Sequence, residues 1–343
     1  MGLYREALDS FRKMIVDGVS PDEITMVSLV SASAKLRDLK MGEALHLYIE
    51  EKNLGIVGSL LNCLVDMYIK CGKMEEAQKL LDRCGADDVD VVLGTTLISG
   101  YVKSNKIDAA RFLFDQMTEK SLISWTAMIS GYVQGGYFYE SLKLFREMRF
   151  KDVWPDEVVL LTALSASVEV GEFRFGRSIH CSILKYGMSV DGFLGNALID
   201  LYAKCEQVNE ACRIFEQLPY KTVVTWNTML DGFCRNGNTS KARAFFDVIP
   251  EKDVISWNTM INCYARYNQF EELFELFRKM QSSNIKADKL TLVSLLSSCA
   301  SVGALNHGIW VHVYMKKNQI SLDSMLGTCL IDMYGRCGCY EIA

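Results

Sequence analysis

The chain has 343 residues, of which half are hydrophobic and only four are proline, and its formal charge is −5 at neutral pH. This composition excludes disordered and collagen-like chains, and the apolar runs are too short and too often broken by charge to cross a membrane. The acidic total counts mildly against a nucleic-acid partner. It does not exclude one, because only the surface that faces the ligand must be positive.

Internal repeats run through the chain from its beginning to its end. LVDMYIKC at 64–71 returns as LIDLYAKC at 198–205 and LIDMYGRC at 330–337, and SWTAMISGY at 124–132 returns as TWNTMLDGF at 225–233 and SWNTMINCY at 256–264. Repeats of this size are typical of helical hairpins that bury their apolar faces only by stacking on neighbours. We divide the chain into one array, 1–343, whose units are 1–22 (partial), 23–57, 58–90, 91–121, 122–156, 157–191, 192–222, 223–253, 254–288, 289–323 and 324–343 (partial).

Each unit begins with a predicted amphipathic helix. In unit 254–288, Trp257, Met260, Ile261 and Tyr264 are positions 4, 7, 8 and 11, which fall on one helix face and predict the buried stripe. Position 15 predicts the turn of the hairpin, because glycine and asparagine tolerate the left-handed conformation that ends a helix. The residues there are Gly72, Asn105, Gly136, Gly171, Gly237, Asn268, Gly303 and Gly338. A second amphipathic helix follows, such as EELFELFRKM at 271–280.

The cysteines and histidines do not form a motif for metal binding or catalysis. None of the twelve cysteines stands in a C-x-x-C pair, and Cys71, Cys205 and Cys337 share one register of the repeat, which is typical of a packing residue. His46, His180 and His312 also share one register and are interpreted as structural, and no histidine precedes an x-Glu pair. We therefore expect no catalytic residue, no metal and no cofactor in this chain, which is not predicted to be an enzyme by itself.

The alternation of 35- and 31-residue units, with strings such as WNTMI and LIDMYGRCG, resembles the pentatricopeptide repeat family and, more narrowly, its plant subclass of P, L and S units. The resemblance implies an all-α fold, a right-handed α-solenoid superhelix of helix-turn-helix repeats. A tetratricopeptide array is disfavoured, because that motif has a small residue where this chain has Ile261. Units 122–156 and 254–288 resemble P; 23–57, 157–191 and 289–323 resemble L; 58–90, 91–121, 192–222, 223–253 and 324–343 resemble S.

Positions 2, 5, 9 and 13 of the first helix lie within about 80° of each other, opposite the buried stripe, and predict a second face that is exposed. Position 2 is apolar and suits stacking on bases, although packing against the neighbouring unit is the alternative. Position 13 is basic and suits contact with phosphates, although a solvated charge at a helix end is the alternative. The proposed stacking residues are Val92, Ile123, Phe193, Val224 and Ile255, and the proposed phosphate contacts are Lys70, Lys103, Lys204, Arg235, Arg266 and Arg336.

Position 5 and the last residue of the unit are expected to read the base. An Asn side chain offers both a hydrogen-bond donor and an acceptor, whereas Thr offers one hydroxyl, so the two can discriminate base edges. A terminal Asp also suits an N-cap of the next helix. The resemblance implies U for Asn62/Asp90, Asn227/Asp253 and Asn258/Asp288, G for Thr126/Asp156, a pyrimidine for Asn196/Thr222 and a purine for Thr95/Ser121, while Thr328 lacks a final partner.

The resemblance thus implies sequence-specific binding of single-stranded RNA, one base per P- or S-like unit, that positions an organelle transcript for C-to-U editing or other processing. It implies partners that carry a deaminase domain or belong to the multiple organellar editing factors, and neither DNA nor a membrane. The implied location is the mitochondrion, with the plastid as the alternative. We also expect the chain to be part of a longer protein whose targeting peptide lies outside it. A tetratricopeptide-like scaffold for protein partners is the alternative function.

Overall fold

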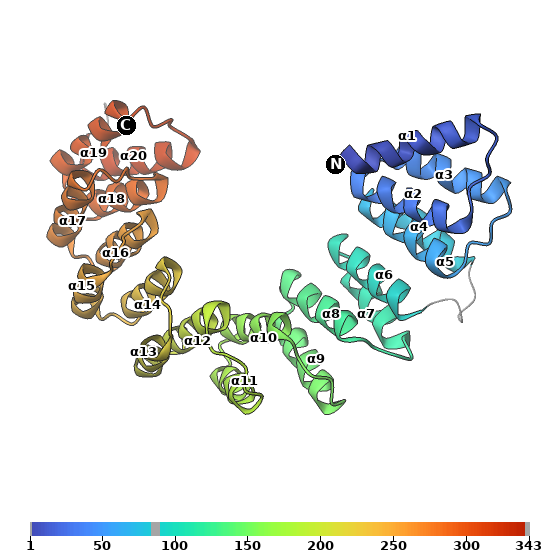
Figure 1. Cartoon of the computed structure of the whole chain (residues 1–343). Coiled ribbons are helices and arrows are strands. Elements are labelled where there is room, and N and C mark those ends of the chain that lie inside the picture. The colour runs from blue at the N-terminus through green and yellow to red at the C-terminus, as the bar shows by residue number, and fades with distance from the viewer. Residues whose placement is uncertain (1, 84–89, 340–343) are drawn as a thin grey trace. The chain divides into compact units, whose positions relative to one another are not determined.

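The structure is a computed structural model that describes residues 2–83 and 90–339, and every regular element in these ranges is an α-helix (Figure 1). The chain divides into two compact bodies, residues 1–166 and 167–343, which we call the N-terminal and C-terminal bodies. Each body is a stack of helical hairpins, which confirms the all-α solenoid fold. Within the described ranges, no helix has the length and apolar character needed to span a membrane.

The helices alternate between the first and second helix of each unit after an N-terminal α1, Gly2–Val16. The first helices are α2 Glu23–Leu36, α4 Gly58–Lys70, α6 Val91–Lys103, α8 Leu122–Gln134, α10 Glu157–Val170, α12 Gly192–Lys204, α14 Val223–Arg235, α16 Val254–Arg266, α18 Lys289–Val302 and α20 Ser324–Arg336. The second helices are α3 Leu39–Glu51, α5 Met74–Asp82, α7 Ile107–Gln116, α9 Phe138–Phe150, α11 Phe173–Lys185, α13 Val208–Gln217, α15 Thr239–Val248, α17 Phe270–Ser282 and α19 Leu305–Lys317.

Consecutive first helices pack side by side and form the inner layer of each stack. In the N-terminal body α2, α4, α6 and α8 contact one another in turn, and in the C-terminal body α12, α14, α16, α18 and α20 do the same. Each first helix begins at the first residue of a unit defined above. The expected stripe is the core of the stack, since Trp257, Met260, Ile261 and Tyr264 are all at most 5% exposed.

The hairpin turn lies at position 15, as predicted. The eight glycines and asparagines named for this position all have a positive φ, between 55° and 79°. Two further units reach the same backbone conformation with other residues, Arg37 (φ 53°) and Glu206 (φ 61°). The stacking of the two helices therefore demands a left-handed residue here whatever its side chain, and Arg37 and Glu206 adopt it at an energetic disadvantage.

The difference between long and short units lies in the second helix. In the 35-residue units this helix has 13 residues, as in α9 and α17, whereas in the short units it has 9 or 10, as in α5 and α13. The long second helices are followed by another left-handed residue, such as Asp152 or Asn284. The short helices α7, α13 and α15 end instead at an extended residue, respectively Met117, Leu218 and Ile249. The second helix is thus three residues longer in the 35-residue units than in the 31-residue units, which accounts for most of the four additional residues.

The repeated octamers mark one kind of junction, that between an L-like unit and the unit that follows it. Met67 packs where a Cβ on Gly42 would stand, and Leu201 and Met333 pack in the same way on Gly176 and Gly308. The tyrosine that follows each of these residues bonds a histidine of the same L-like unit. The three pairs are His46 Nδ1 with Tyr68 OH at 2.7 Å, and His180 with Tyr202 and His312 with Tyr334 at 2.9 Å each. The shared register of the histidines therefore has a structural cause.

Glycine before the aromatic residue at position 11, found in two of the three copies of the other recurring string and in ISGY at 98–101, marks close approach of two first helices. A Cβ on Gly100 would lie 2.8 Å from the side chain of Ile69, and one on Gly131 would lie 2.4 Å from Val102. The residue at position 12 of one unit therefore occupies the space above position 10 of the next.

We predict that Glu206→Gly stabilises the chain. Glycine removes the penalty of a left-handed β-carbon but adds entropy to the unfolded chain, so the expected net gain is about 0.5–1 kcal/mol. The measurement is the free energy of unfolding of the C-terminal body in urea. Gln207→Gly is the control: φ is −94° there, so glycine brings only the entropic disadvantage and should destabilise. A loss of stability in E206G would contradict this explanation of the turn.

We predict that acidification destabilises the chain in part through His180. Burial lowers the pKa of His180 from its ordinary 6.5, and Glu210 only partly opposes this. Below pH about 6.5 the unfolded chain takes up this proton more readily than the folded chain, so stability falls as the pH drops from 6.5 toward the lower folded-state value. The fall in the thermal unfolding midpoint between pH 7.5 and 5.5 should be smaller in His180→Phe. An unchanged pH dependence would show that His180 does not titrate in this way.

Candidate nucleic-acid interface

In most units the last residue caps the first helix of the next unit; Val57 and Asp191 are the exceptions. The side-chain oxygen of a capping residue accepts a hydrogen bond from the backbone N–H of the third residue of that helix, which is one of the N–H groups that lack a partner inside the helix. The caps and their acceptor distances are Asp90 (2.7 Å), Ser121 (3.2 Å), Asp156 (2.9 Å), Thr222 (3.3 Å), Asp253 (2.8 Å) and Asp288 (2.9 Å). The capping role is therefore present at Asp90, Asp156, Asp253 and Asp288, whereas Asp191 makes no such bond.

The same aspartates bond the asparagine at position 5 of their own unit. Nδ2 of Asn258 donates to Oδ2 of Asp288 at 2.8 Å, and Asn227 donates to Asp253 at 3.0 Å. Asn62 donates to Asp90 over a longer 3.2 Å. Residues that are 26 to 30 positions apart in the sequence are thus held in direct contact on one side of the inner layer.

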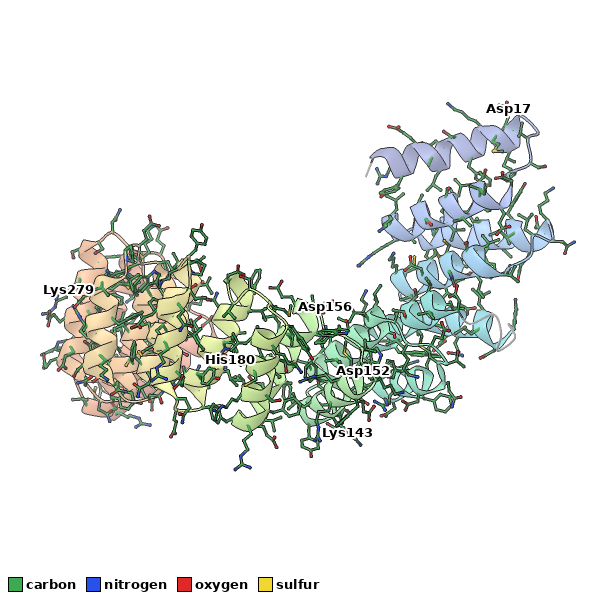
Figure 2. The ribbon with its side chains drawn as sticks, turned by 60° about the horizontal axis from the view of Figure 1, so that its bottom comes forward. Asp17, Lys143, Asp152, Asp156, His180 and Lys279 are labelled. Carbon is green, nitrogen blue, oxygen red and sulfur yellow. The ribbon has the colours of Figure 1, made fainter. Side chains whose placement is uncertain are left out.

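The threonines at position 5 make different bonds. Thr95, Thr126 and Thr328 donate their hydroxyl protons to the backbone carbonyl four residues earlier in their own helix. Asp156, the partner expected for Thr126, stands at the start of α10 (Figure 2), where its carboxylate is engaged with the backbone of Val159. In the structure, the two residues of each Asn/Asp pair are therefore joined by a hydrogen bond. Each Thr pair is defined only by the two positions that its residues occupy in the unit.

The exposed fraction of the side chains differs between positions 2 and 5 of the face that the sequence predicted to be exposed. The five apolar residues at position 2 are 60–76% exposed, so these side chains do not pack into the neighbouring unit. At position 5, in contrast, Asn227 and Asn258 are only 8% and 5% exposed, and Asn62, Asn196, Thr95 and Thr126 are half-buried. The asparagines are buried because their amides form hydrogen bonds across the unit boundary and therefore lie against the next helix. Position 2 is therefore the exposed ridge of this surface, and position 5 lies below it.

Most of the basic residues at position 13 are paired with an aspartate at position 9. Lys70 bonds Asp66 at 2.6 Å and Lys204 lies 3.0 Å from Asp200. Arg235 with Asp231 and Arg336 with Asp332 form the same pair one helical turn apart. Lys103 and Arg266 have the neutral residues Ser99 and Asn262 at position 9 instead. The row of cations is therefore partly neutralised within its own helices.

Two groups of residues in this surface did not stand out in the sequence. The first is a hydroxyl at position 3, of which Ser256 and Thr291 bond the preceding asparagine. The signal was present as Ser or Thr three residues after the terminal Asp, a spacing typical of a helix cap. The second is the lysine before the last residue of short units. Lys120, Lys221 and Lys252 each donate to a carbonyl three residues earlier and lie 5.2–5.3 Å from the ring centre of a phenylalanine.

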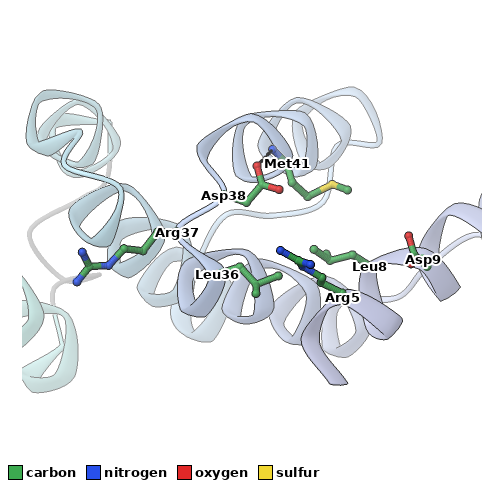
Figure 3. Close-up of a pocket in the computed structure, with 7 residues that line it drawn as sticks. All are labelled: Arg5, Leu8, Asp9, Leu36, Arg37, Asp38 and Met41. Carbon is green, nitrogen blue, oxygen red and sulfur yellow. Dashed lines mark hydrogen bonds between the residues drawn. The ribbon is translucent and has the colours of Figure 1, made fainter. Parts of the chain in front are cut away.

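A surface pocket beside α1 and the start of α3 is lined by Arg5, Leu8, Asp9, Leu36, Arg37, Asp38 and Met41 (Figure 3). Asp38 in this pocket accepts the backbone N–H of Met41 at 3.1 Å and so serves as a helix cap. Among the described residues, no group of three or more His, Cys, Asp or Glu side chains is arranged to hold a metal ion.

We predict that Asn258→Asp destabilises the chain strongly. The new carboxylate would stand at hydrogen-bonding distance from Asp288, in a buried place where the amide now donates. The expected loss is about 3 kcal/mol at neutral pH, and it should shrink in acid as one of the two groups takes up a proton. Asn62→Asp is the control, because Asn62 is half-buried and its bond is longer, so its loss should be smaller. Equal losses in urea unfolding would contradict the described network.

The comparisons with known proteins agree with this repeat architecture. Models of the PPR repeat match residues 59–88, 95–122, 123–153, 196–221 and 221–249, and a model of the PPR repeat family matches residues 252–301. A pentatricopeptide repeat-containing protein of Arabidopsis thaliana is 39% identical over 99% of this chain, which spans 37% of that relative. A mitochondrial relative from the same plant is 35% identical over 97% of the chain, and a chloroplastic one is 30% identical over 98%.

Solved structures show the same fold. The crystal structure of the pentatricopeptide repeat protein PPR10 from maize superposes with a TM-score of 0.62 at 18% identity, covering 98% of this chain and 50% of that chain. The complex of PPR10 with an 18-nt psaJ RNA element gives the same TM-score. The chain spans less than half the length of the Arabidopsis relatives described above. From its repeat models and these relatives, the chain belongs to the pentatricopeptide repeat family.

Proposed function

We propose that this chain binds single-stranded RNA in a sequence-specific manner, with one base facing each P- or S-like unit. The observation that carries the proposal is the direct hydrogen bond between position 5 and the last residue, as in Asn227 with Asp253 and Asn258 with Asp288. A packing role alone does not require the same donor–acceptor pair beside an exposed apolar ridge in consecutive units. Such a pair presents a defined hydrogen-bonding edge next to a surface on which a base can stack.

The chemistry of the pair favours uracil. An ionised carboxylate only accepts hydrogen bonds, whereas an Asn amide that has used one N–H on the carboxylate keeps a second N–H to donate. Uracil offers a complementary edge, because its N3–H donates and its carbonyl oxygens accept. Cytosine has an acceptor at N3, which would face the carboxylate oxygen without a proton between them. We therefore assign U to units 58–90, 223–253 and 254–288.

In the remaining units the hydrogen-bonding edge that position 5 and the last residue present to a base is less defined. We assign G to Thr126/Asp156, a pyrimidine to Asn196/Thr222 and a purine to Thr95/Ser121. Val92, Ile123, Phe193, Val224 and Ile255 would stack on the bases, which their 60–76% exposure supports. Lys103 and Arg266 would contact phosphates most readily, since no aspartate stands one turn before them in the helix.

We further propose that the protein acts on transcripts of an organelle, the mitochondrion or the plastid. Relatives named as mitochondrial and chloroplastic support this location. The alternation of long and short second helices supports membership of the plant subclass with P, L and S units. In this proposal the chain recognises and positions the RNA for C-to-U editing or other processing, and a deaminase-bearing domain or partner supplies the reaction.

We predict that Asn258→Thr changes one letter of the preferred RNA from U toward G. Threonine removes the amide donor and leaves Asp288 in place, which is the combination found in unit 122–156 with Thr126 and Asp156. The measurement is selection of bound sequences from a pool of randomised single-stranded RNA by the wild-type chain and by N258T. The two motifs should differ at one position only. Identical motifs, or a loss of all preference in both, would refute the proposed assignment.

We predict that Asp231→Asn tightens RNA binding. The substitution releases Arg235 from its ion pair, so the affinity should rise a few-fold at low salt, and the slope of log Kd against log salt should steepen by about 0.7. Asp247→Asn is the matched control, because Asp247 pairs with Arg243 in the same way on the second helix of the same unit. Equal effects of D231N and D247N would place the RNA elsewhere on the molecule.

A further inference from the structure

The structure assigns a positioning role to two buried hydroxyl groups, those of Ser256 and Thr291. We propose that each one fixes the amide of the asparagine in the preceding unit, Asn227 and Asn258 respectively, and thereby sets how strictly that unit selects its base. This inference rests on the proposed function, because base selection has meaning only if the chain binds RNA. It adds a residue from the neighbouring unit to the pair that faces the base.

The hydroxyls contact both members of the pair. Oγ of Ser256 donates to Oδ1 of Asn227 at 2.6 Å and lies 2.8 Å from Oδ1 of Asp253. Thr291 bonds Oδ1 of Asn258 in the same way and lies 2.9 Å from Oδ1 of Asp288. Ser256 and Thr291 are fully buried, so no water competes for these bonds. Each hydroxyl therefore links the asparagine to the aspartate that caps its own helix.

The result is an amide whose orientation is determined before any ligand arrives. Oδ1 of Asn227 is occupied by the hydroxyl, and one Nδ2 proton is occupied by Asp253. A rotation of the amide by 180° would bring its oxygen against the carboxylate, which is repulsive, and would break the bond that this oxygen accepts from the Ser256 hydroxyl. The group left for a ligand is the second Nδ2 proton, a donor. Such preorganisation sharpens selection because the binding step does not have to order the side chain.

The pKa of Asp253 supports the same conclusion. Burial acts to raise the pKa of this carboxyl, but hydrogen bonds from Ser256 and Asn227 outweigh it and lower the pKa below its ordinary value. The backbone N–H of Ser256 and the amide of Asn227, which the hydroxyl holds in place, thus help to keep Asp253 ionised, and an ionised carboxylate is the form that accepts from the N3–H of uracil.

Two other units contain the asparagine without this arrangement. In unit 58–90 the residue that follows the Asp90 cap by three is Leu93, which has no hydroxyl, and the Asn62–Asp90 bond is longer at 3.2 Å. In unit 192–222 the cap is Thr222, and Oγ1 of Thr225 is bonded to it at 3.1 Å. Oδ1 of Asn196 is there buried without a hydrogen-bond partner. We infer that these two units discriminate between U and C less strictly than units 223–253 and 254–288.

The test compares Ser256→Ala with Ser256→Thr in the 343-residue chain. The resemblance to the family implies that the RNA runs 5′ to 3′ along the chain, so the letter that faces unit 223–253 lies immediately 5′ of the one that N258T changes. The probes are four synthetic RNA oligonucleotides with the motif selected by the wild-type chain, which differ only at that letter. The readout is the ratio of Kd for C to Kd for U at that letter. We expect S256A to lower this ratio by about fivefold, which is the effect of one hydrogen bond, and S256T to keep it within about twofold of wild type.

The controls separate this inference from the proposed function. Ser141→Ala removes an equally buried hydroxyl that bonds the carbonyl of Ile129 in α8, and it should leave the ratio unchanged. A wild-type ratio near one would overturn both the proposed function and this inference. A wild-type preference for U that S256A preserves would overturn this inference alone. Hydrogen exchange of the Asn227 side-chain amide, followed by NMR without RNA, should accelerate in S256A and not in S141A, and equal rates would also contradict the proposal.

Discussion

The structure depends on how each first helix satisfies the N–H groups of its first turn. For most first helices the partner comes from the last residue of the preceding unit, and Asp90, Asp253 and Asp288 use the same carboxylate to bond an asparagine. The capping requirement therefore fixes the last residue of one unit against the start of the next, and the asparagine follows it. A pair that is proposed to recognise a base is thus built from groups that the helix needs for its own stability.

Because many of its aspartates bond groups within the protein, an acidic chain can still bind a negatively charged ligand. Several aspartates act as caps, and those at position 9 neutralise the adjacent cations, as Asp200 does for Lys204. These ion pairs are partly exposed and contribute little to stability, so a phosphate can compete for the cation. The apolar residues at position 2 remain exposed above this row. The surface therefore combines apolar residues for stacking, hydrogen-bonding pairs, and cations that a phosphate can take from their aspartates. Its proposed selectivity comes from the hydrogen-bonded pairs rather than from net charge.

The unit starts, the buried stripe and the hairpin turns could be predicted from the sequence because each has a local cause. Helical periodicity marked Trp257 and Tyr264, and the need for a left-handed residue marked Gly237. Glu206 was missed because the stacking of two helices imposes its conformation, which its side chain does not signal. The burial of Asn227 and Asn258 was missed for a similar reason, since it arises from bonds to Ser256 and Thr291 in the next unit. Helical-wheel arguments treat one helix at a time and place these asparagines on an open face.

The proposed recognition requires that RNA lies along the first helices, with bases beside position 2 and their edges toward position 5. Photocrosslinking of single-stranded RNA that contains 4-thiouridine, followed by mass spectrometry of the linked peptides, reports this placement without any substitution in the protein. We expect crosslinks within α14 and α16, centred on Val224 and Ile255 and the residues next to them. Crosslinks confined to the second helices α15 and α17, with none on the first helices, would contradict the proposed placement.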